Sequence, residues 1–282
     1  MIDAAWALTL ATACLLAGDW SNRRLVGWLP EDPPRPGRKQ HAQPIPLAGI
    51  LLAPALLLWP LLDRQWLIVA AGAIALATGF VDDRRKEHEQ DLGWRSKALA
   101  LGAASALGAS ALVEPLQEPG AWCLHVLFVF VVTNATNFLD NTNGVAAALA
   151  GVGLLQLGGA GGNTAAGFAA LAFLPWNWPR ARLFLGDSGA YALGILLAIG
   201  CAKAAQHEPL PIALAAVALP LIDFTQVVCA RLWIGHPPWV GDRRHLTHVA
   251  RNLGVPTAAI APLFLGLALL AMSAARLWRG AA

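Results

Sequence analysis

Residues 66–82 read WLIVAAGAIALATGFVD, a run with no charged side chain before its last residue. A helix of about 20 residues, with a range of about 17–25, crosses the roughly 30 Å hydrocarbon core of a bilayer. The rest of the chain has the same character: 57% of its 282 residues are apolar and 13% are charged. Soluble domains carry about 25% charged residues, which cover their surface. The sequence therefore predicts an integral membrane protein.

Ten stretches of the chain come close to the length and apolarity of a transmembrane helix. They lie near residues 3–19, 44–62, 66–82, 96–114, 120–139, 143–159, 162–178, 188–204, 209–233 and 255–278. We therefore predict an all-α, polytopic membrane protein with about ten transmembrane helices. Because we find no internal repeat and no linker, we predict that residues 1–282 form one membrane-embedded domain.

The basic residues are distributed unevenly between alternate loops. Sixteen of the 20 Lys and Arg residues belong to one set of loops and adjoining helix ends, and the other set holds only Arg64, Lys203, Arg276 and Arg279. Because cytoplasmic loops are enriched in Lys and Arg, the rich side is predicted to be cytoplasmic and both termini periplasmic. The formal net charge of +3 is too small to indicate a nucleic-acid partner.

Five polar clusters all fall on the predicted cytoplasmic side. The first, GRKQHAQPIPLAG at residues 37–49, places Arg38, Lys39 and His41 before a Pro-containing turn. These three side chains could bind an anion. A basic flank of a membrane helix, with a loop histidine, would have the same composition.

The second cluster, GFVDDRRKEHEQDLGWRSK at residues 79–97, contains the adjacent acids Asp82 and Asp83. Neighbouring carboxylates repel each other, and one proton or one cation relieves the repulsion. Mg²⁺ is a natural cation here because it favours carboxylates together with substrate phosphates. Alternatively, the acids end a helix and pair with the basic run at residues 84–86.

The third cluster, TNATNFLDNTNG at residues 133–144, repeats a polar residue every three positions, at Asn134, Asn137 and Asp140. On a helix this spacing keeps the three side chains near one face. The Asn-rich and Gly-rich ending is also typical of a simple turn.

The fourth cluster, FLGDSGAYALG at residues 184–194, places Asp187 between two glycines before an apolar helix. Glycine allows close approach of a phosphorylated ligand to the backbone. An acid at this position could equally serve only as a helix cap.

The fifth cluster is GHPPWVGDRRHLTHVARNLG, residues 235–254. Its basic and imidazole residues are Arg243, Arg244, His245, His248 and Arg251. The two histidines are one helical turn apart, so both could face one phosphate. They could also bind zinc, although no third ligand stands at a standard spacing.

One acid lies inside a predicted membrane helix. Asp223 belongs to the apolar stretch ALPLIDFTQVV, where an ionisable residue is by default functional or supports a functional group. Together with the five clusters, acids able to hold a divalent ion share a membrane face with cations able to hold phosphates. This combination favours phosphoryl transfer, in which catalysis is mainly positioning and charge neutralisation.

The five clusters, in this order, resemble those of the polyprenyl-phosphate N-acetylhexosamine-1-phosphate transferases of glycosyltransferase family 4. The resemblance is closer to the bacterial undecaprenyl-phosphate GlcNAc-1-phosphate transferase branch, and it runs from about residue 30 to residue 254. The matching residues are Arg38, Lys39, His41, Pro44, Pro46, Gly49, Asp82, Asp83, Asn134, Ala135, Asn137, Asp140, Phe184, Gly186, Asp187, Gly189, Pro220, Leu221, Asp223, His245 and His248.

The resemblance implies transfer of an N-acetylhexosamine 1-phosphate from a UDP-sugar to undecaprenyl or another polyprenyl phosphate, with release of UMP. It implies Mg²⁺, or Mn²⁺ in its place, with Asn137 and Asp187 as metal ligands. The catalytic residues implied are Asp82, Asp83, Asp140, His245 and His248. The substrate-binding residues implied are Arg38, Lys39, His41, Lys97, Asn134, Asn143, Arg243 and Arg244.

The same resemblance implies a multi-pass protein of the bacterial inner membrane. Its active site would face the cytoplasm, and its product would initiate cell-envelope glycan synthesis. The resemblance is also compatible with a homodimer. The chain departs from the family at Asn143, where bacterial members usually have an Asp, and at Thr247, which replaces the middle histidine of H-x-H-H. The absence of an H-H-H-F-E ending argues against the branch that transfers phospho-MurNAc-pentapeptide.

Two other functions are compatible with the residues. A transporter or lipid flippase could use Asp140 and Asp223, but would be expected to place charges near the bilayer midplane and often to contain a repeat. A catalytically inactive family member that binds lipid phosphate is the second alternative, for which Asn143 and Thr247 are the hints.

Overall fold

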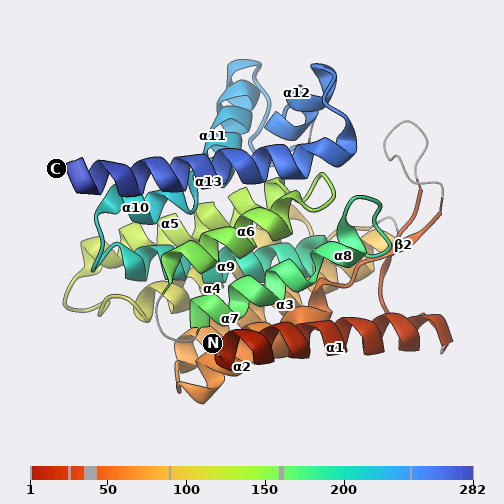
Figure 1. Cartoon of the computed structure of the whole chain (residues 1–282), viewed down its shortest axis with the longest axis horizontal. Helices are drawn as coiled ribbons and strands as arrows, with labels where there is room; N and C mark the ends of the chain where they lie inside the picture. The colour runs from red at the N-terminus through yellow and green to blue at the C-terminus, as the bar shows by residue number, and fades with distance from the viewer. Residues whose placement is uncertain are drawn as a thin grey trace.

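A computed structural model of the chain describes residues 2–24, 27–34, 43–88, 90–158, 162–241 and 243–281 and is mostly helical (Figure 1). The α-helices are α1 (Ile2–Arg24), α2 (Ala53–Leu62), α3 (Trp66–Glu87), α4 (Trp94–Ser110), α5 (Pro119–Phe138), α6 (Val145–Leu157), α7 (Gly162–Ala172), α8 (Leu174–Asn177), α9 (Gly186–Ala204), α10 (Leu210–Ala215), α11 (Ala218–Trp233), α12 (Leu246–Asn252) and α13 (Thr257–Ala281). A 3₁₀ helix, η1 (Gly49–Leu52), precedes α2.

Helix α9 is the central element of the bundle. Its sequence is apolar on all sides, as expected for a helix surrounded by other helices, and the residues from Ser188 to Ala202 are buried. It packs mainly against α3 and α5, and also contacts α6. Figure 1 shows α1 and α13 running in opposite directions along two borders of the bundle, with α9 between them.

Glycines bring α3 and η1 into close contact with the beginning of α9. A Cβ atom at Gly79 of α3 would lie 2.3 Å from the backbone nitrogen of Ser188. A Cβ atom at Gly49 would lie 2.4 Å from the backbone nitrogen of Gly189. Neither position therefore has room for a side chain, and the N-terminus of α9 is held against two neighbouring elements.

The outer surface of the bundle is rich in large apolar side chains. On α13, Leu263, Leu267 and Leu270 are exposed, and Trp6 of α1 and Leu99 of α4 are more than half exposed. Apolar surface of this extent is atypical of a soluble monomer and is what a bilayer would cover. Within the described ranges, three helices are long and apolar enough to cross a membrane: Trp66–Glu87, Pro119–Phe138 and Thr257–Trp278.

Each of the ten predicted apolar stretches contains helix, but several boundaries differ. Helix α3 continues to Glu87, five residues beyond its predicted end, so Asp82 and Asp83 lie within the helix. The stretch 209–233 is divided into α10 and α11 by a break at residues 216–217. The stretch 162–178 is divided into α7 and α8.

The fold is not purely helical. Strand β1 (Glu31–Asp32) pairs antiparallel with β2 (Ile45–Pro46). The segment following β2 also meets the end of the α8–α9 connection, where Leu47 forms a β-bridge with Phe184. These short strands occur between Pro-rich segments, where helix is disfavoured. They bring the segment after α1 next to the N-terminus of α9.

Candidate active site

Asp83 of α3 holds the first turn of α9. Its Oδ1 accepts a hydrogen bond from the backbone N–H of Asp187 (3.0 Å), and its Oδ2 accepts one from the backbone N–H of Ser188 (3.1 Å). These N–H groups have no partner within their own helix. Gly186 has a φ of +68°, and a Cβ atom there would lie 2.7 Å from Oδ2 of Asp83. The buried acid on α3 therefore fixes the backbone that carries Asp187.

The carboxylate of Asp187 contacts the side chains of Asn137 and Lys86. Its Oδ1 accepts a hydrogen bond from Nδ2 of Asn137 (3.0 Å), and its Oδ2 lies 2.9 Å from Nζ of Lys86. The fold thus brings together the end of α5 and the start of α9, and with them the two side chains predicted to bind a metal. Sequence reasoning had considered Lys86 only as part of a basic helix end.

Asp82, although adjacent to Asp83, has a different environment. It is fully buried and lies 2.7 Å from Nζ of Lys86 and 3.2 Å from Nζ of Lys97. Its other oxygen accepts a hydrogen bond from the backbone N–H of Leu92 (2.8 Å). Asp82 joins α3 to the start of α4, and the cavity lining described below includes Asp83 but neither Asp82 nor Lys97.

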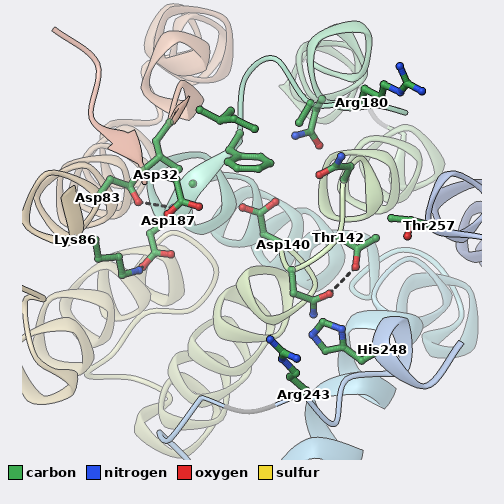
Figure 2. Close-up of a pocket in the computed structure, with 18 of the residues that line it drawn as sticks. Asp32, Asp83, Lys86, Asp140, Thr142, Arg180, Asp187, Arg243, His248 and Thr257 are labelled. Carbon is green, nitrogen blue, oxygen red and sulfur yellow. Dashed lines mark hydrogen bonds and ion pairs between the residues drawn. The ribbon is translucent and has the colours of Figure 1, made fainter. Parts of the chain in front are cut away.

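A cavity of about 1370 Å³ opens beside these residues (Figure 2). Asp83, Asp140 and Asp187 line one part of it. The cationic and imidazole groups of the fifth sequence cluster that line it are Arg243, His248 and Arg251. Figure 2 shows Asp140 between the Asp187 side and the His248 side of the cavity. The cavity therefore has carboxylates on one part of its wall and cationic and imidazole groups on a facing part (Figure 2).

Asp140 lies in the turn after α5 and is half-buried. Burial raises the pKa of Asp140 well above its usual range, and the negative charges of Asp187 and Asp83 raise it further. A cation near these carboxylates would relieve the repulsion between them. In the described part of the chain, no three acidic, histidine or cysteine side chains are grouped closely enough to form a metal site by themselves.

A second cavity, of about 260 Å³, shares part of this wall. Its lining includes Asp140, Asn141 and Asp187, which also line the larger cavity. The remainder comes from the end of α5, from α11 and from the segment before α12: Asn137, Phe138, Arg231, Trp239, Gly241 and His245. The three shared residues therefore mark the junction of the two cavities.

The two predicted histidines line different cavities. His245 lines the smaller cavity and His248 the larger one, with their ring centroids 6.0 Å apart. His245 immediately precedes α12 and is buried against the edge of Phe138. Burial lowers the pKa of His248 below its usual value, and the nearby charge of Arg251 lowers it further. The two histidines therefore lie near the junction of the two cavities, but they do not lie on one face of a helix.

Thr247, which stands in place of a histidine, is completely buried. Its hydroxyl is hydrogen-bonded to Oδ1 of Asn141, which also accepts a hydrogen bond from the hydroxyl of Thr142 (2.9 Å). Thr247 therefore links α12 to the loop after α5, where both cavities meet.

The remaining predicted residues have varied positions. Asn143 lines the larger cavity, and its amide donates to the carbonyl of Pro179 (3.3 Å). The amide of Asn134 donates instead to the carbonyl of Phe130, one turn earlier in α5. Neither Asn134 nor Arg244 is among the described residues that line the two cavities. Arg38, Lys39 and His41 lie outside the described residues.

Asn177 is an organising residue that sequence reasoning missed. Its buried side chain accepts a hydrogen bond from the backbone N–H of Gly144 (2.6 Å) and donates to the carbonyl of Leu183 (2.9 Å). It thereby ties the loop after α5 to the segment that leads into α9. The sequence places it in an apolar stretch, FLPWNW, where a single polar residue was the available signal.

Comparison with known proteins finds a family and several relatives that are similar to this chain. The family described as glycosyl transferase family 4 matches residues 65–204, which include Asp82, Asp83, Asn137, Asp140 and Asp187. A decaprenyl-phosphate N-acetylglucosaminephosphotransferase of Mycolicibacterium smegmatis is 27% identical over 77% of this chain and 68% of its own length. An undecaprenyl-phosphate alpha-N-acetylglucosaminyl 1-phosphate transferase of Thermotoga maritima is 27% identical over 77% of this chain and 72% of its own length.

A third relative, the decaprenyl-phosphate N-acetylglucosaminephosphotransferase of Mycobacterium tuberculosis, is 26% identical over 66% of this chain. The match spans 57% of that relative's length. The resemblance to polyprenyl-phosphate N-acetylhexosamine-1-phosphate transferases is thus confirmed, and a transferase is favoured over a transporter or an inactive homologue. Across residues 65–204, the chain is thus similar to glycosyl transferase family 4.

Proposed function

We propose that this protein is a membrane enzyme that transfers an N-acetylhexosamine 1-phosphate, with GlcNAc 1-phosphate as the first candidate, from a UDP-sugar to a polyprenyl phosphate. The observation that carries the proposal is the lining of the larger cavity, which contains Asp140 and Asp187 together with Arg243, His248 and Arg251. Phosphoryl transfer needs such a combination, because a metal-binding acid and phosphate-binding cations must act on one pyrophosphate. The activities for which the relatives are named support the substrate class.

In the proposed reaction, an oxygen of the lipid monophosphate attacks the phosphorus that carries the sugar. The bond from this phosphorus to the bridging oxygen breaks, and UMP leaves with the electron pair. The second pKa of a phosphate monoester is about 6, so most of the acceptor is already a dianion at neutral pH. A strong general base is therefore not required. The position of Asp82 agrees with this. Asp82 is paired with Lys86 and Lys97 and is not among the described residues that line the cavity.

The residues fit a divalent cation such as Mg²⁺. This ion binds through one or two carboxylates and completes its coordination with substrate phosphates and water. Asp140 and Asp187 supply carboxylates to both cavities, and Asn137 adjoins Asp187. When bound, the ion would polarise the phosphate oxygens and neutralise developing charge. Lys86 would keep the Asp187 carboxylate in place, while Arg243 and Arg251 offset charge on the donor phosphates.

The proposed membrane arrangement has about ten spans, with both termini in the periplasm of a bacterial inner membrane. Both cavities are lined by loops from the Lys-rich and Arg-rich side, which supports a cytoplasmic site. An engineered cysteine at the exposed position Gln90, in a variant lacking the four native cysteines, tests this arrangement. Labelling by an impermeant reagent should require disrupted cells, and labelling of intact cells would contradict the topology.

The function is tested by measuring UMP release by the purified protein in lipid or detergent. Release should require a UDP-N-acetylhexosamine, a polyprenyl phosphate and Mg²⁺ together, and should stop when a chelator removes the metal. A transporter would move a substrate without producing UMP. An inactive homologue would bind polyprenyl phosphate without producing UMP.

A further inference from the structure

The carboxylate of Asp223, in the middle of α11, is completely buried and uses both of its oxygens. Oδ2 lies 2.8 Å from Nδ1 of His245, and Oδ1 accepts a hydrogen bond from the backbone N–H of Leu246 (2.6 Å). One acid thus holds both the side chain of His245 and the first amide of the helix that follows it.

The contact between Asp223 and Nδ1 of His245 determines the chemistry of the imidazole. An ionised carboxylate only accepts hydrogen bonds, so Nδ1 of His245 must carry a proton. A neutral ring is then restricted to the tautomer with a free lone pair on Nε2, and a charged ring donates from Nε2. Because Asp223 engages Nδ1, Nε2 is the ring nitrogen left for a ligand in the smaller cavity, which His245 lines together with Asp140 and Asp187.

A role limited to capping α12 does not explain the contact with His245. A single oxygen satisfies a helix-end N–H, and Ser, Thr or Asn can provide it. A buried carboxylate has a large desolvation cost unless both its charge and its oxygens are compensated. The imidazole of His245 provides that compensation. Carboxylate and imidazole therefore depend on each other, at the edge of a cavity that the proposed reaction uses.

We propose that Asp223 is a positioning residue that orients His245 and favours its charged ring, so that Nε2–H donates a hydrogen bond to a phosphate oxygen during transfer. This inference rests on the proposed function of the cavities. Asp223 touches no substrate itself and acts through His245. The edge contact of His245 with Phe138, at 5.4 Å between ring centroids, limits rotation of the ring from another side.

Asp223→Asn is the informative variant. Its amide oxygen can still accept the hydrogen bond from Leu246, so α12 keeps its cap. Its NH₂ group then faces Nδ1 of His245 and moves the proton of the neutral ring to Nε2. Because the NH₂ group does not favour a charged ring, we expect kcat to fall on the order of 10²-fold, as for loss of one preorganised charge-stabilising group, with little change in the KM for the donor.

The double variant Asp223→Asn, His245→Ala separates positioning from a structural role. If Asp223 acts through His245, the double variant should be no slower than His245→Ala alone, because coupled residues are not additive. Asp63→Asn, the same chemical exchange in the turn between α2 and α3, is the matched control and should keep full activity. Additive losses in the double variant would overturn the inference.

The tautomer itself can be read without turnover by ¹⁵N NMR of the histidine rings. His245→Ala identifies the His245 signal among the seven histidines. The wild type should show Nδ1 protonated, and Asp223→Asn should show protonation at Nε2 when the ring is neutral. An unchanged tautomer would contradict the inference even in an active enzyme. If the protein shows the expected tautomers but releases no UMP, the proposed function fails while the pairing of Asp223 with His245 stands.

Discussion

Asp83 and Asp187 are joined through the backbone: the Asp83 carboxylate binds the N–H of Asp187 and of the next residue, while the Asp187 side chain lines both cavities. Asp223 holds α12 in a comparable way, through the N–H of Leu246. In both cases a buried acid on one helix holds the end of the helix that carries a candidate site residue. Asp83 holds a helix end, whereas the side chain of Asp187 reaches both cavities, and this difference leads to the first two predictions.

Asp83→Ala should reduce stability and activity together. The substitution leaves two helix-end N–H groups without their acceptor, and loss of such a cap costs about 0.5–2 kcal/mol. We expect a lower melting temperature in detergent and a loss of UMP release. Asp83→Asn keeps one acceptor and should melt between the wild type and Asp83→Ala. Wild-type melting of Asp83→Ala would show that Asp83 does not hold α9.

Asp187→Asn should abolish turnover and leave the fold intact. The substitution preserves the size of the side chain but removes a negative charge that we assign to metal binding, while Lys86 retains Asp82 as a partner. UMP release measures turnover, and the melting temperature measures the fold. Retained Mg²⁺-dependent activity would exclude the assignment. A matched fall in stability would indicate a structural role instead.

Affinity for the donor should fall with rising pH because of His248. Burial, Arg251, His245 and Arg243 lower the pKa of His248 in the free protein, and Asp223 opposes them. A bound pyrophosphate is negative and favours the protonated ring of His248, so the pKa of His248 is higher in the complex than in the free protein. At pH values between these two pKa values, donor binding therefore takes up a proton. The KM for the UDP-sugar should increase through that window, which begins below the usual histidine value of about 6.5. His248→Gln should lose this part of the pH dependence, and an unchanged profile would contradict it.

Thr247→His should weaken the protein, although it restores the usual family pattern. Thr247 is fully buried and hydrogen-bonded to Asn141, so an imidazole would overpack the site. Overpacking costs typically about 1–3 kcal/mol, and the loop that carries Asp140 would shift. Thr247→Ser keeps the hydroxyl and should remain close to wild type. A faster enzyme with His at this position would mean that this chain is a weakened catalyst.

The helical segments could be predicted from the sequence because apolar runs of membrane length are a local signal. Chain breaks inside such runs, as at residues 216–217, depend on packing against neighbours and have no equally clear signal. Of the three polar residues spaced three apart, Asn137 and Asp140 line the smaller cavity and Asn134 does not. Asp140 lies in the turn after α5, so helix spacing alone does not explain its position.

The different environments of Asp82 and Asp83 could not be predicted. Successive residues on a helix point about 100° apart, so one acid faces α9 and the other faces Lys86 and Lys97. Which acid faces which partner depends on how α3 is rotated in the bundle. The pairing of Asp223 with His245 joins residues that are 22 positions apart in the chain. The sequence indicates that each is a candidate functional residue, but it does not indicate that the two are in contact.

The most direct measurement of the central claim follows the phosphate of the donor. Purified protein is given a UDP-N-acetylhexosamine labelled with radioactive phosphorus on the phosphate next to the sugar, together with polyprenyl phosphate and Mg²⁺. The account predicts that the label moves into the lipid product while unlabelled UMP is released in equal amount. Label retained in released UDP, or no product from folded protein with any UDP-N-acetylhexosamine, would contradict it.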